Sequence, residues 1–464
     1  MMEVRALEAA NNGRSMFQLA LFLTIAHVTT WSLHVAAYAA VPARNMLGTH
    51  YALAYSGLYV LVCSTVALLA VKLWEGNRGV QATDAGIDLL DMLGNPSLVA
   101  VFCLLSVIGL GLHYYDKLII NHFSGACLAD LRGAWIDATV ARGRTLSSWQ
   151  SALGHILSHA TFPLLFVLFI GGQRLPRWLR LTGWSVAIGS TLLYAVIIGT
   201  RTTILSFVAC AILAVGLYLY LQRNENIVSE AKRALKALAM VLAMALTYAA
   251  AISADRMYCH GGPNLYVDQF VPELSAEFAG PLPESAIGRL AMLIGLYVSH
   301  SSWTFEKSLD FPNRSGAVFL NFGWYWFYRL GVIDAMPPGE RPYQHGMMSL
   351  TGAAWYDFDL VGMIVVAILH GILVAFAAFL LSTSGIRQAL GVLAYVCIGL
   401  ITLWAPLAFA PNTLSYPFIG LAFLSYILCA WAVSALAGSI NWVLVRADRR
   451  DGRYALNADY TPLK

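Results

Sequence analysis

The sequence predicts an all-α, polytopic integral membrane protein, and three observations support that prediction. Of the 464 residues, 59% are hydrophobic and 12% are charged, which leaves too few polar side chains to cover a soluble surface. The apolar residues form long continuous runs, whereas the strands of a membrane barrel alternate. Backbone amides inside a bilayer must be bonded within the chain, so each run is expected to be a helix.

Ten windows essentially free of Lys, Arg, Asp and Glu are long enough to cross about 30 Å of hydrocarbon as helices. They lie near 16–41, 50–71, 97–115, 151–171, 180–200, 202–221, 237–253, 360–384, 388–410 and 414–440. Two shorter windows, 290–305 and 315–328, are also free of charge and are candidates for dipping into or crossing the membrane. The sequence therefore predicts about ten to twelve membrane helices.

The windows divide the chain into four parts: seven helices in 1–252, one large loop in 253–359, three helices in 360–445 and a tail in 446–464. Lys and Arg are more frequent in the connections that share a side with both termini. The termini are therefore expected in the cytoplasm and the large loop outside. Residues 113–150, on the outer face, mix aromatic and charged side chains, which predicts an amphipathic helix along the membrane surface.

The outer face carries cations set among aromatic side chains. Arg289, Arg314 and Arg341 lie in the large loop, and Arg201 stands in a Gly199-Thr200-Arg201 turn between two apolar windows. Guanidinium groups bind phosphate oxygens through paired hydrogen bonds, and aromatic rings stack on sugars. The pattern favours an anionic, sugar-bearing ligand. The alternatives are arginines that snorkel to lipid headgroups and an aromatic belt at the interface.

Several side chains in the outer segments are candidates for a general base, which must be a carboxylate or imidazole within reach of a hydroxyl. In chain order they are Asp116, His300, Glu306, His345 and Asp357, and the sequence does not rank them. Asp357 and Asp359 stand where the eighth span begins. The alternative role is to stabilise the positive end of a helix dipole, which suits Asp359 better than Asp357.

The cysteines and the overall charge predict no metal site, no cofactor and no nucleic-acid partner. Five of the seven cysteines lie in apolar runs, where they act as small hydrophobic residues. Cys127 and Cys259 lie outside these runs without C-x-x-C spacing, and two free thiols are expected in preference to a disulfide. The net charge of +4 is small and spread along the chain.

Three motifs together resemble the O-antigen and oligosaccharide repeat-unit polymerases, often called Wzy-like. Tyr356-Asp357-Phe358-x-Leu360-x-Gly362 resembles the family's "Y-x-D-F-G-x-x-G" stretch, and Gly-Thr-Arg201 is similar to its "G-S-R" turn. Leu112-His113-Tyr114-Tyr115-Asp116, followed by an amphipathic segment, also fits. The resemblance covers about residues 97–385. Asp359 stands where the family usually has Gly, and Thr200 replaces the commoner Ser.

The resemblance implies an enzyme, a glycosyltransferase of the bacterial inner membrane. It would join undecaprenyl-diphosphate-linked repeat units into O-antigen or exopolysaccharide chains at the periplasmic face, without a metal or cofactor. The arginines Arg201, Arg289, Arg314 and Arg341 would stabilise the diphosphates, and one of the five base candidates would take the proton of the acceptor hydroxyl. The implied partners are the lipid-linked oligosaccharide, membrane lipid, a chain-length regulator and a flippase.

Two other functions remain as alternatives, an O-antigen ligase and a transporter or flippase for the same lipid-linked sugar. The ligase pattern His-x10-Gly fails, because the residues eleven positions after His260, His300 and His345 are Val271, Phe311 and Tyr356. Transporters commonly carry inverted repeats and ionisable residues in mid-span. The sequence indicates neither feature, since its charges lie outside the windows.

Overall fold

The computed structural model describes residues 15–41, 43–45, 50–76, 89–121, 148–198, 202–221, 227–259, 276–278, 285–309, 318–319, 333, 348–408, 410 and 415–450. Within these ranges, ten helical segments are long and apolar enough to cross a membrane, and each overlaps one predicted window. The all-α, multi-pass fold class is therefore confirmed.

The elements follow one another in this order: α2 (Met16–Ala40), β1 (Ala43–Asn45), α3 (Tyr51–Gly76), α4 (Leu89–Leu93), α5 (Pro96–Tyr114), the π-helix η1 (Tyr115–Ile120), α7 (Trp149–Ser158), α8 (Thr161–Ile170), the 3₁₀ turn η2 (Gly172–Arg174), α9 (Arg177–Ile198), α10 (Thr202–Leu221), α11 (Ile227–Cys259), β2 (Ala276–Phe278), α13 (Ala286–Ser308), α15 (Leu350–Leu381), α16 (Gly385–Trp404) and α17 (Ser415–Arg450).

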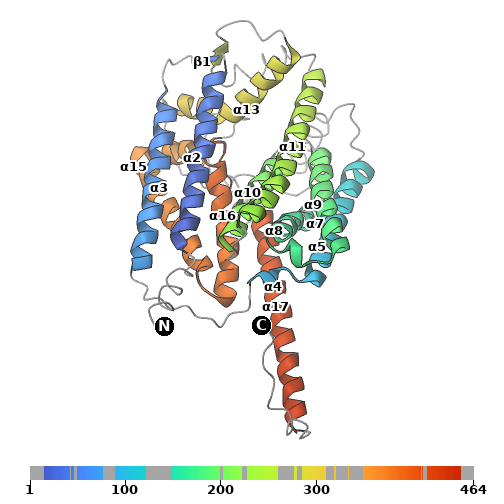
Figure 1. Ribbon diagram of the computed structural model, residues 1–464. Coiled ribbons are helices and arrows are strands. Elements are labelled where there is room, and N and C mark those ends of the chain that lie inside the picture. Colours follow the sequence, from blue (N-terminus) through green and yellow to red (C-terminus); the bar gives the residue numbers. More distant parts are fainter. Residues whose placement is uncertain are drawn as a thin grey trace.

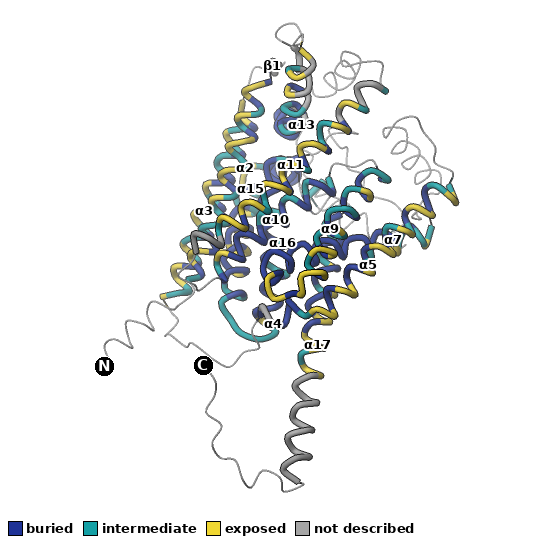
Figure 2. Tube along the Cα trace, turned by 45° about the vertical axis from the view of Figure 1, so that its right-hand side comes forward, coloured by how far each residue is buried: buried dark blue, intermediate teal, exposed yellow. Residues whose placement is uncertain are grey.

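The helices form two groups that lie side by side (Figure 1). The first helix group is α2, α3, α13, α15 and α16, and the second is α5, α7, α8, α9 and α10. They meet where α10 packs against α2 and α16, and one hydrophobic core runs through both. Many outward-facing apolar side chains are exposed along α2, α3, α5 and α15 (Figure 2), as expected for a surface in contact with lipid.

Backbones come close together in the first group because of a glycine. A Cβ at Gly371 of α15 would lie 2.5 Å from the carbonyl oxygen of Cys63 on α3. Small residues permit such approaches between membrane helices, where packing replaces the hydrophobic driving force.

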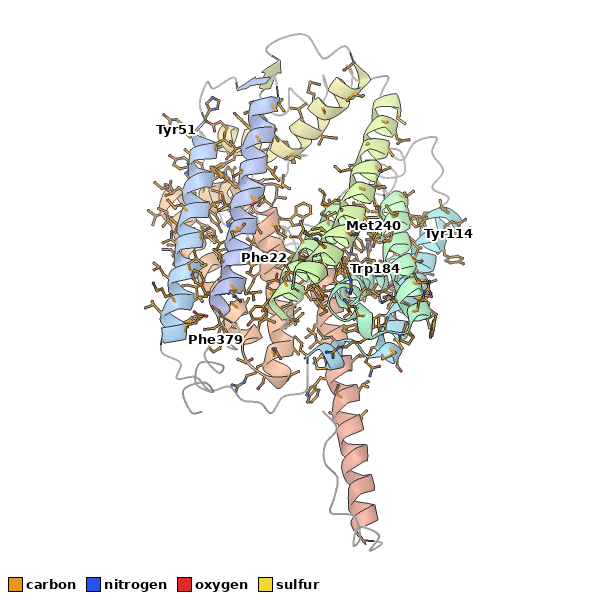
Figure 3. The ribbon with its side chains drawn as sticks, in the orientation of Figure 1. Phe22, Tyr51, Tyr114, Trp184, Met240 and Phe379 are labelled. Carbon is orange, nitrogen blue, oxygen red and sulfur yellow. The ribbon has the colours of Figure 1, made fainter. Side chains whose placement is uncertain are left out.

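The connection between α2 and α3 lies at the same end of the molecule as part of the large loop. β1 pairs antiparallel with β2, with Ala43 opposite Phe278. At the other end, Ser15 Oγ donates to Glu75 Oε1 at 2.9 Å, so the start of α2 lies beside the end of α3. Tyr51 and Phe379, labelled in Figure 3, mark these two ends of the first group. We call the end that carries β1 and β2 the loop end.

Two of the spans are broken, which the continuous windows did not predict. The span 149–170 consists of α7 and α8, separated by His159 and Ala160, and 83% of its apolar window is buried in the protein. The other break is at Asp359 in α15, where φ is 64° and ψ is −175°. His159 and Ala160 at the first break are buried, as expected for irregular backbone at membrane depth, whereas Asp359 is partly exposed.

Among its described residues, the predicted large loop contains helix at three places, the first of which is the end of α11, which continues to Cys259. α13 covers the window 290–305 and is not among the ten membrane-spanning segments. α15 begins at Leu350, inside the segment predicted as loop, and its residues through Asp357 are buried. Most of the window 315–328 and the middle of 113–150 lie outside the described residues. α17 continues as helix to Arg450, past residue 446, where the tail was expected to begin.

Candidate functional site

The structure describes four of the five base candidates and brings three of them to the loop end of the first group. His300 and Glu306 lie on α13, and Asp357 lies on the buried first part of α15. Asp116 lies apart from them, on η1 in the second group. Outside the described residues are His345, Arg201, Arg314 and Arg341. Arg289 lies on α13, and only its backbone is described.

α13 is held firmly over the loop end by contacts with several helices. Ser302 Oγ is hydrogen-bonded to His34 Nε2 of α2 at 2.6 Å, and Ser301 Oγ donates to the carbonyl of Pro406 at 2.6 Å. The ring of Trp303 stacks on Tyr38 with centres 4.4 Å apart. These contacts bury His300 and Glu306 against the bundle.

Glu306 caps the first turn of α3. Its two carboxylate oxygens accept the backbone N–H of Tyr51 at 3.1 Å and of Ala52 at 2.6 Å. The first amides of a helix have no intrahelical acceptor, and a carboxylate there also interacts favourably with the helix dipole. Glu306 therefore stabilises the start of α3, whereas Asp359 accepts the N–H of Leu360 where the second part of α15 begins.

Asp357 is the described carboxylate candidate for which one oxygen has no hydrogen-bond partner within the described ranges. Its Oδ2 accepts the backbone N–H of Phe319 at 2.5 Å. Its Oδ1 is buried and has no hydrogen-bond partner among the described residues. A carboxylate held by one oxygen, with lone pairs open on the other, is suited to accept a proton from a hydroxyl within reach.

The break in α15 lies just after Asp357. Asp359 is in a backbone region that essentially only glycine occupies, and its Oδ1 accepts the N–H of Leu360 at 2.7 Å. A Cβ at Gly362 would lie 2.1 Å from the Cβ of Phe358. The break therefore depends on Gly362, and it separates the buried residues before Asp357 from the apolar, partly exposed helix that follows.

Asp116 is part of a buried ion pair. Its carboxylate lies 2.8 Å from Lys117 Nζ and accepts from Ser148 Oγ and from Asn121 Nδ2 at 3.1 Å. The pair lies on η1, and π-helical turns frequently occur at functional sites. Tyr114, next to it, points outward in Figure 3 and is 53% exposed.

Four buried histidines that the sequence did not suggest as site residues lie inside the spans. The interpretation that no ionisable residue lies in mid-span is wrong, because His27, His155, His159 and His370 are all buried there. His155 and His159 stand four residues apart within one charge-free window. That spacing would have indicated that they share one side of a helical turn.

The expectation that Cys259 is a free thiol is also wrong, because this residue, at the end of α11, is disulfide-bonded. Cys127 lies outside the described residues, and the other five cysteines are free. Within the described part of the chain, no three His, Cys, Asp or Glu side chains are grouped as metal ligands would be. Comparison of the chain with protein-family models, curated proteins and solved structures gives no match.

Proposed function

We propose that this protein is a repeat-unit polymerase that joins undecaprenyl-diphosphate-linked oligosaccharides at the periplasmic face of the inner membrane. The observation that carries the proposal is Asp357, a buried carboxylate beside a break in a membrane helix, with one bonded oxygen and one that has no hydrogen-bond partner among the described residues. It lies within the motif that resembles the polymerase family. Asp359, which stands where the family has Gly, has a backbone conformation typical of Gly.

In this proposal Asp357 Oδ1 takes the proton from the acceptor hydroxyl as the hydroxyl oxygen attacks the sugar carbon of the donor. The bond between that carbon and the diphosphate breaks, and a glycosidic bond forms. The leaving lipid diphosphate gains negative charge, which arginine side chains would stabilise. Arg201, Arg289, Arg314 and Arg341 are the arginines assigned to this task. The protonated Asp357 then returns its proton to water.

The disulfide at Cys259 supports a periplasmic position for the loop end. The residue stands at the end of α11, where the large loop begins, and disulfides persist in oxidising compartments such as the bacterial periplasm. The pairing of β1 with β2 brings the connection between α2 and α3 to the same end as the large loop. This agrees with the prediction that an even number of spans separates these two segments.

The direct test is Asp357→Asn in a host that lacks its own polymerase. Asn keeps an oxygen that accepts the N–H of Phe319 but is no base, so the protein should stay in the membrane while turnover falls about 10²–10⁴-fold. On a gel of the surface polysaccharide, the long-chain ladder should collapse to single repeat units. Asp359→Asn is the matched control and should keep the ladder. A full ladder from Asp357→Asn at normal protein level would remove Asp357 from the mechanism.

A second test concerns the arginines. Arg→Ala at positions 201, 289, 314 and 341 should each leave single repeat units, and Arg→Lys should restore the ladder in part, because an ammonium lacks the paired hydrogen bonds of a guanidinium. If all four alanine variants keep the full ladder, the arginines are interfacial anchors.

A transporter of the lipid-linked sugar is the second candidate, favoured by the broken span and the buried histidines. The products distinguish these functions. Loss of a polymerase leaves single repeat units at the cell surface, loss of a flippase leaves them on the cytoplasmic side, and loss of a ligase leaves long chains on the lipid carrier.

A further inference from the structure

Asp357 is held by Val318 and Phe319, two residues of the large loop. Its Oδ2 accepts the N–H of Phe319, 38 residues earlier in the chain, and the backbone of Val318 hydrogen-bonds the same carboxyl group. Both loop residues are partly buried and pack against a hydrophobic cluster that includes Trp355 and Tyr356 of α15. Because the donors are backbone groups, their position relative to α15 depends on how this turn is packed.

An aromatic pair attaches the turn to α15. The ring of Phe319 lies against that of Phe358 with centres 5.4 Å apart and planes at 70°. Aromatic rings favour this edge-to-face arrangement, because the positive edge of one meets the negative face of the other. Phe319 therefore contacts α15 twice, through its N–H at Asp357 and through its ring at Phe358. We call Phe319 and Phe358 the aromatic clasp.

The break in α15 places Phe358 for this contact. In a regular helix, the Cβ atoms of residues four apart are separated by about 5–6 Å. Here a Cβ at Gly362 would lie 2.1 Å from the Cβ of Phe358, and the non-helical residue Asp359, with φ of 64°, lies between them. The break therefore folds Phe358 back over Gly362, at a position that a continuous helix does not offer.

The position of the Asp357 carboxylate depends on these contacts. Oδ1 has no hydrogen-bond partner among the described residues, so within that part of the chain the hydrogen bonds that orient the carboxylate come from the turn. A base must be held in one geometry relative to the reacting hydroxyl, and a misplacement of about 1 Å can slow a reaction about 10²-fold.

We propose that the aromatic clasp positions the carboxylate of Asp357 for proton transfer. This inference rests on the proposed function, in which Asp357 is the base. Phe319 and Phe358 are positioning residues and not catalytic ones, because each ring acts through the N–H of Phe319 and the carboxylate that it holds. The break in α15 then serves the reaction by turning Phe358 toward the loop.

The first test measures turnover, as the rate at which the lipid-linked repeat units of a polymerase-deficient host are joined in its membranes. Phe319→Ala and Phe358→Ala should each lower this rate about 10–100-fold at normal protein level, because the carboxylate is no longer held in one place. Tyr at either position keeps the ring and should restore most of the rate. Full turnover in both alanine variants would overturn the proposal.

Phe376→Ala is the matched control, because it removes another aromatic pair from the same helix. Phe376 is 42% exposed, against 37% for Phe358, and its ring stacks on that of Phe379 with centres 6.2 Å apart. Phe379, labelled in Figure 3, lies near the opposite end of α15 from Asp357. Turnover should be unchanged in this variant, and a loss equal to that of Phe358→Ala would overturn the proposal.

Combination with Asp357→Asn separates positioning from a general loss of structure. If the clasp acts only through the Asp357 carboxylate, Phe319→Ala should change the residual rate of the Asp357→Asn protein by less than about twofold. A further loss of about tenfold or more would show that Phe319 acts elsewhere and would overturn the proposal.

A second measurement does not depend on the reaction. Hydrogen–deuterium exchange of the whole protein in bilayers, followed by mass spectrometry, reports whether the N–H of Phe319 stays bonded. Phe358→Ala should speed exchange at this amide at least about tenfold, and Phe376→Ala should not. Slow exchange in Phe358→Ala would overturn the clasp. If exchange responds as expected but Asp357→Asn keeps full turnover, the contact is supported and the proposed role of Asp357 as the base fails.

Discussion

His370 of the first helix group and the histidines near the break in the second group are all buried, but their imidazoles are used in opposite ways. The contrast concerns His370 and not its whole group, since Nε2 of His27 on α2 has no hydrogen-bond partner among the described residues. In the first group, His370 Nδ1 is bonded to Tyr59 OH at 3.1 Å, and Nε2 to Thr402 Oγ1 at 3.0 Å. The Thr402 hydroxyl donates to the carbonyl of Ile398, so it accepts from His370 Nε2–H. In the second group, four ring nitrogens have no hydrogen-bond partner among the described residues: both nitrogens of His113 and Nε2 of His155 and His159. A fully bonded imidazole ties helices together, while an open one is available for proton transfer.

The carboxylates show the same contrast within the first group. Glu306 uses both oxygens to cap α3, whereas Asp357 Oδ1 has no hydrogen-bond partner in the part of the chain that the structure describes. Burial is almost the same for the two side chains. The number of bonded oxygens, and not exposure, separates the structural carboxylate from the candidate base.

The largest expected effect comes from Gly109→Ala, which tests whether the second group depends on direct backbone contact. The new Cβ would overlap the backbone of Ser158, which has no side-chain freedom to move away, so we expect a loss of about 3 kcal/mol or more of stability. The melting temperature in detergent and the amount of folded protein measure it. The control is Gly111→Ala on the same helix, where a Cβ meets nothing within 4 Å and stability should be unchanged or slightly higher. Equal effects at the two positions would disprove the packing argument.

The next largest effect is the difference in unfolding free energy that we expect between His370→Leu and His159→Leu. The first leaves Tyr59 and Thr402 without their partner and should cost about 1–3 kcal/mol of unfolding free energy. The second removes an open nitrogen together with a single hydrogen bond, so stability should change by less than about 1 kcal/mol. Thermal unfolding of the two variants compares them directly. If His159→Leu destabilises the protein as much as His370→Leu, the number of bonded ring nitrogens does not decide how much each histidine contributes to stability.

A smaller loss of stability is expected for Glu306→Gln, and Asp357→Asn is the variant to compare with it. Gln has one acceptor oxygen for two helix amides and no charge for the dipole, so we expect a loss of about 0.5–2 kcal/mol. Asp357→Asn should leave stability almost unchanged while it lowers turnover. Melting curves and polymer gels of both variants together test this division, and a stable, fully active Glu306→Gln protein would contradict the capping role.

The smallest effect is expected for Asp359→Gly. A non-glycine residue in this backbone region costs on the order of 1–3 kcal/mol, and the greater freedom of Gly in the unfolded chain offsets part of the relief. We expect a gain of about 1 kcal/mol, visible as a higher melting temperature with the ladder kept. A lower melting temperature would show that the hydrogen bond from Leu360 N–H to Asp359 Oδ1 outweighs the strain.

The ten spans were predictable from the sequence because the backbone amides of an apolar run in a bilayer must be hydrogen-bonded within that run, which makes it a helix. The length of the run and the absence of charged residues are then enough to locate the helix. The hydrogen bond that holds Asp357 Oδ2, the capping role of Glu306, the disulfide at Cys259 and the packing of His113 on His155 were not predictable. Each depends on which atoms from distant parts of the chain meet, as when Gly109 lets α5 reach the end of α7 and brings His113 to His155. Lipid makes every apolar segment form a helix by itself. The contacts of the polar atoms are decided only when the helices pack and each of these atoms gains or loses a partner.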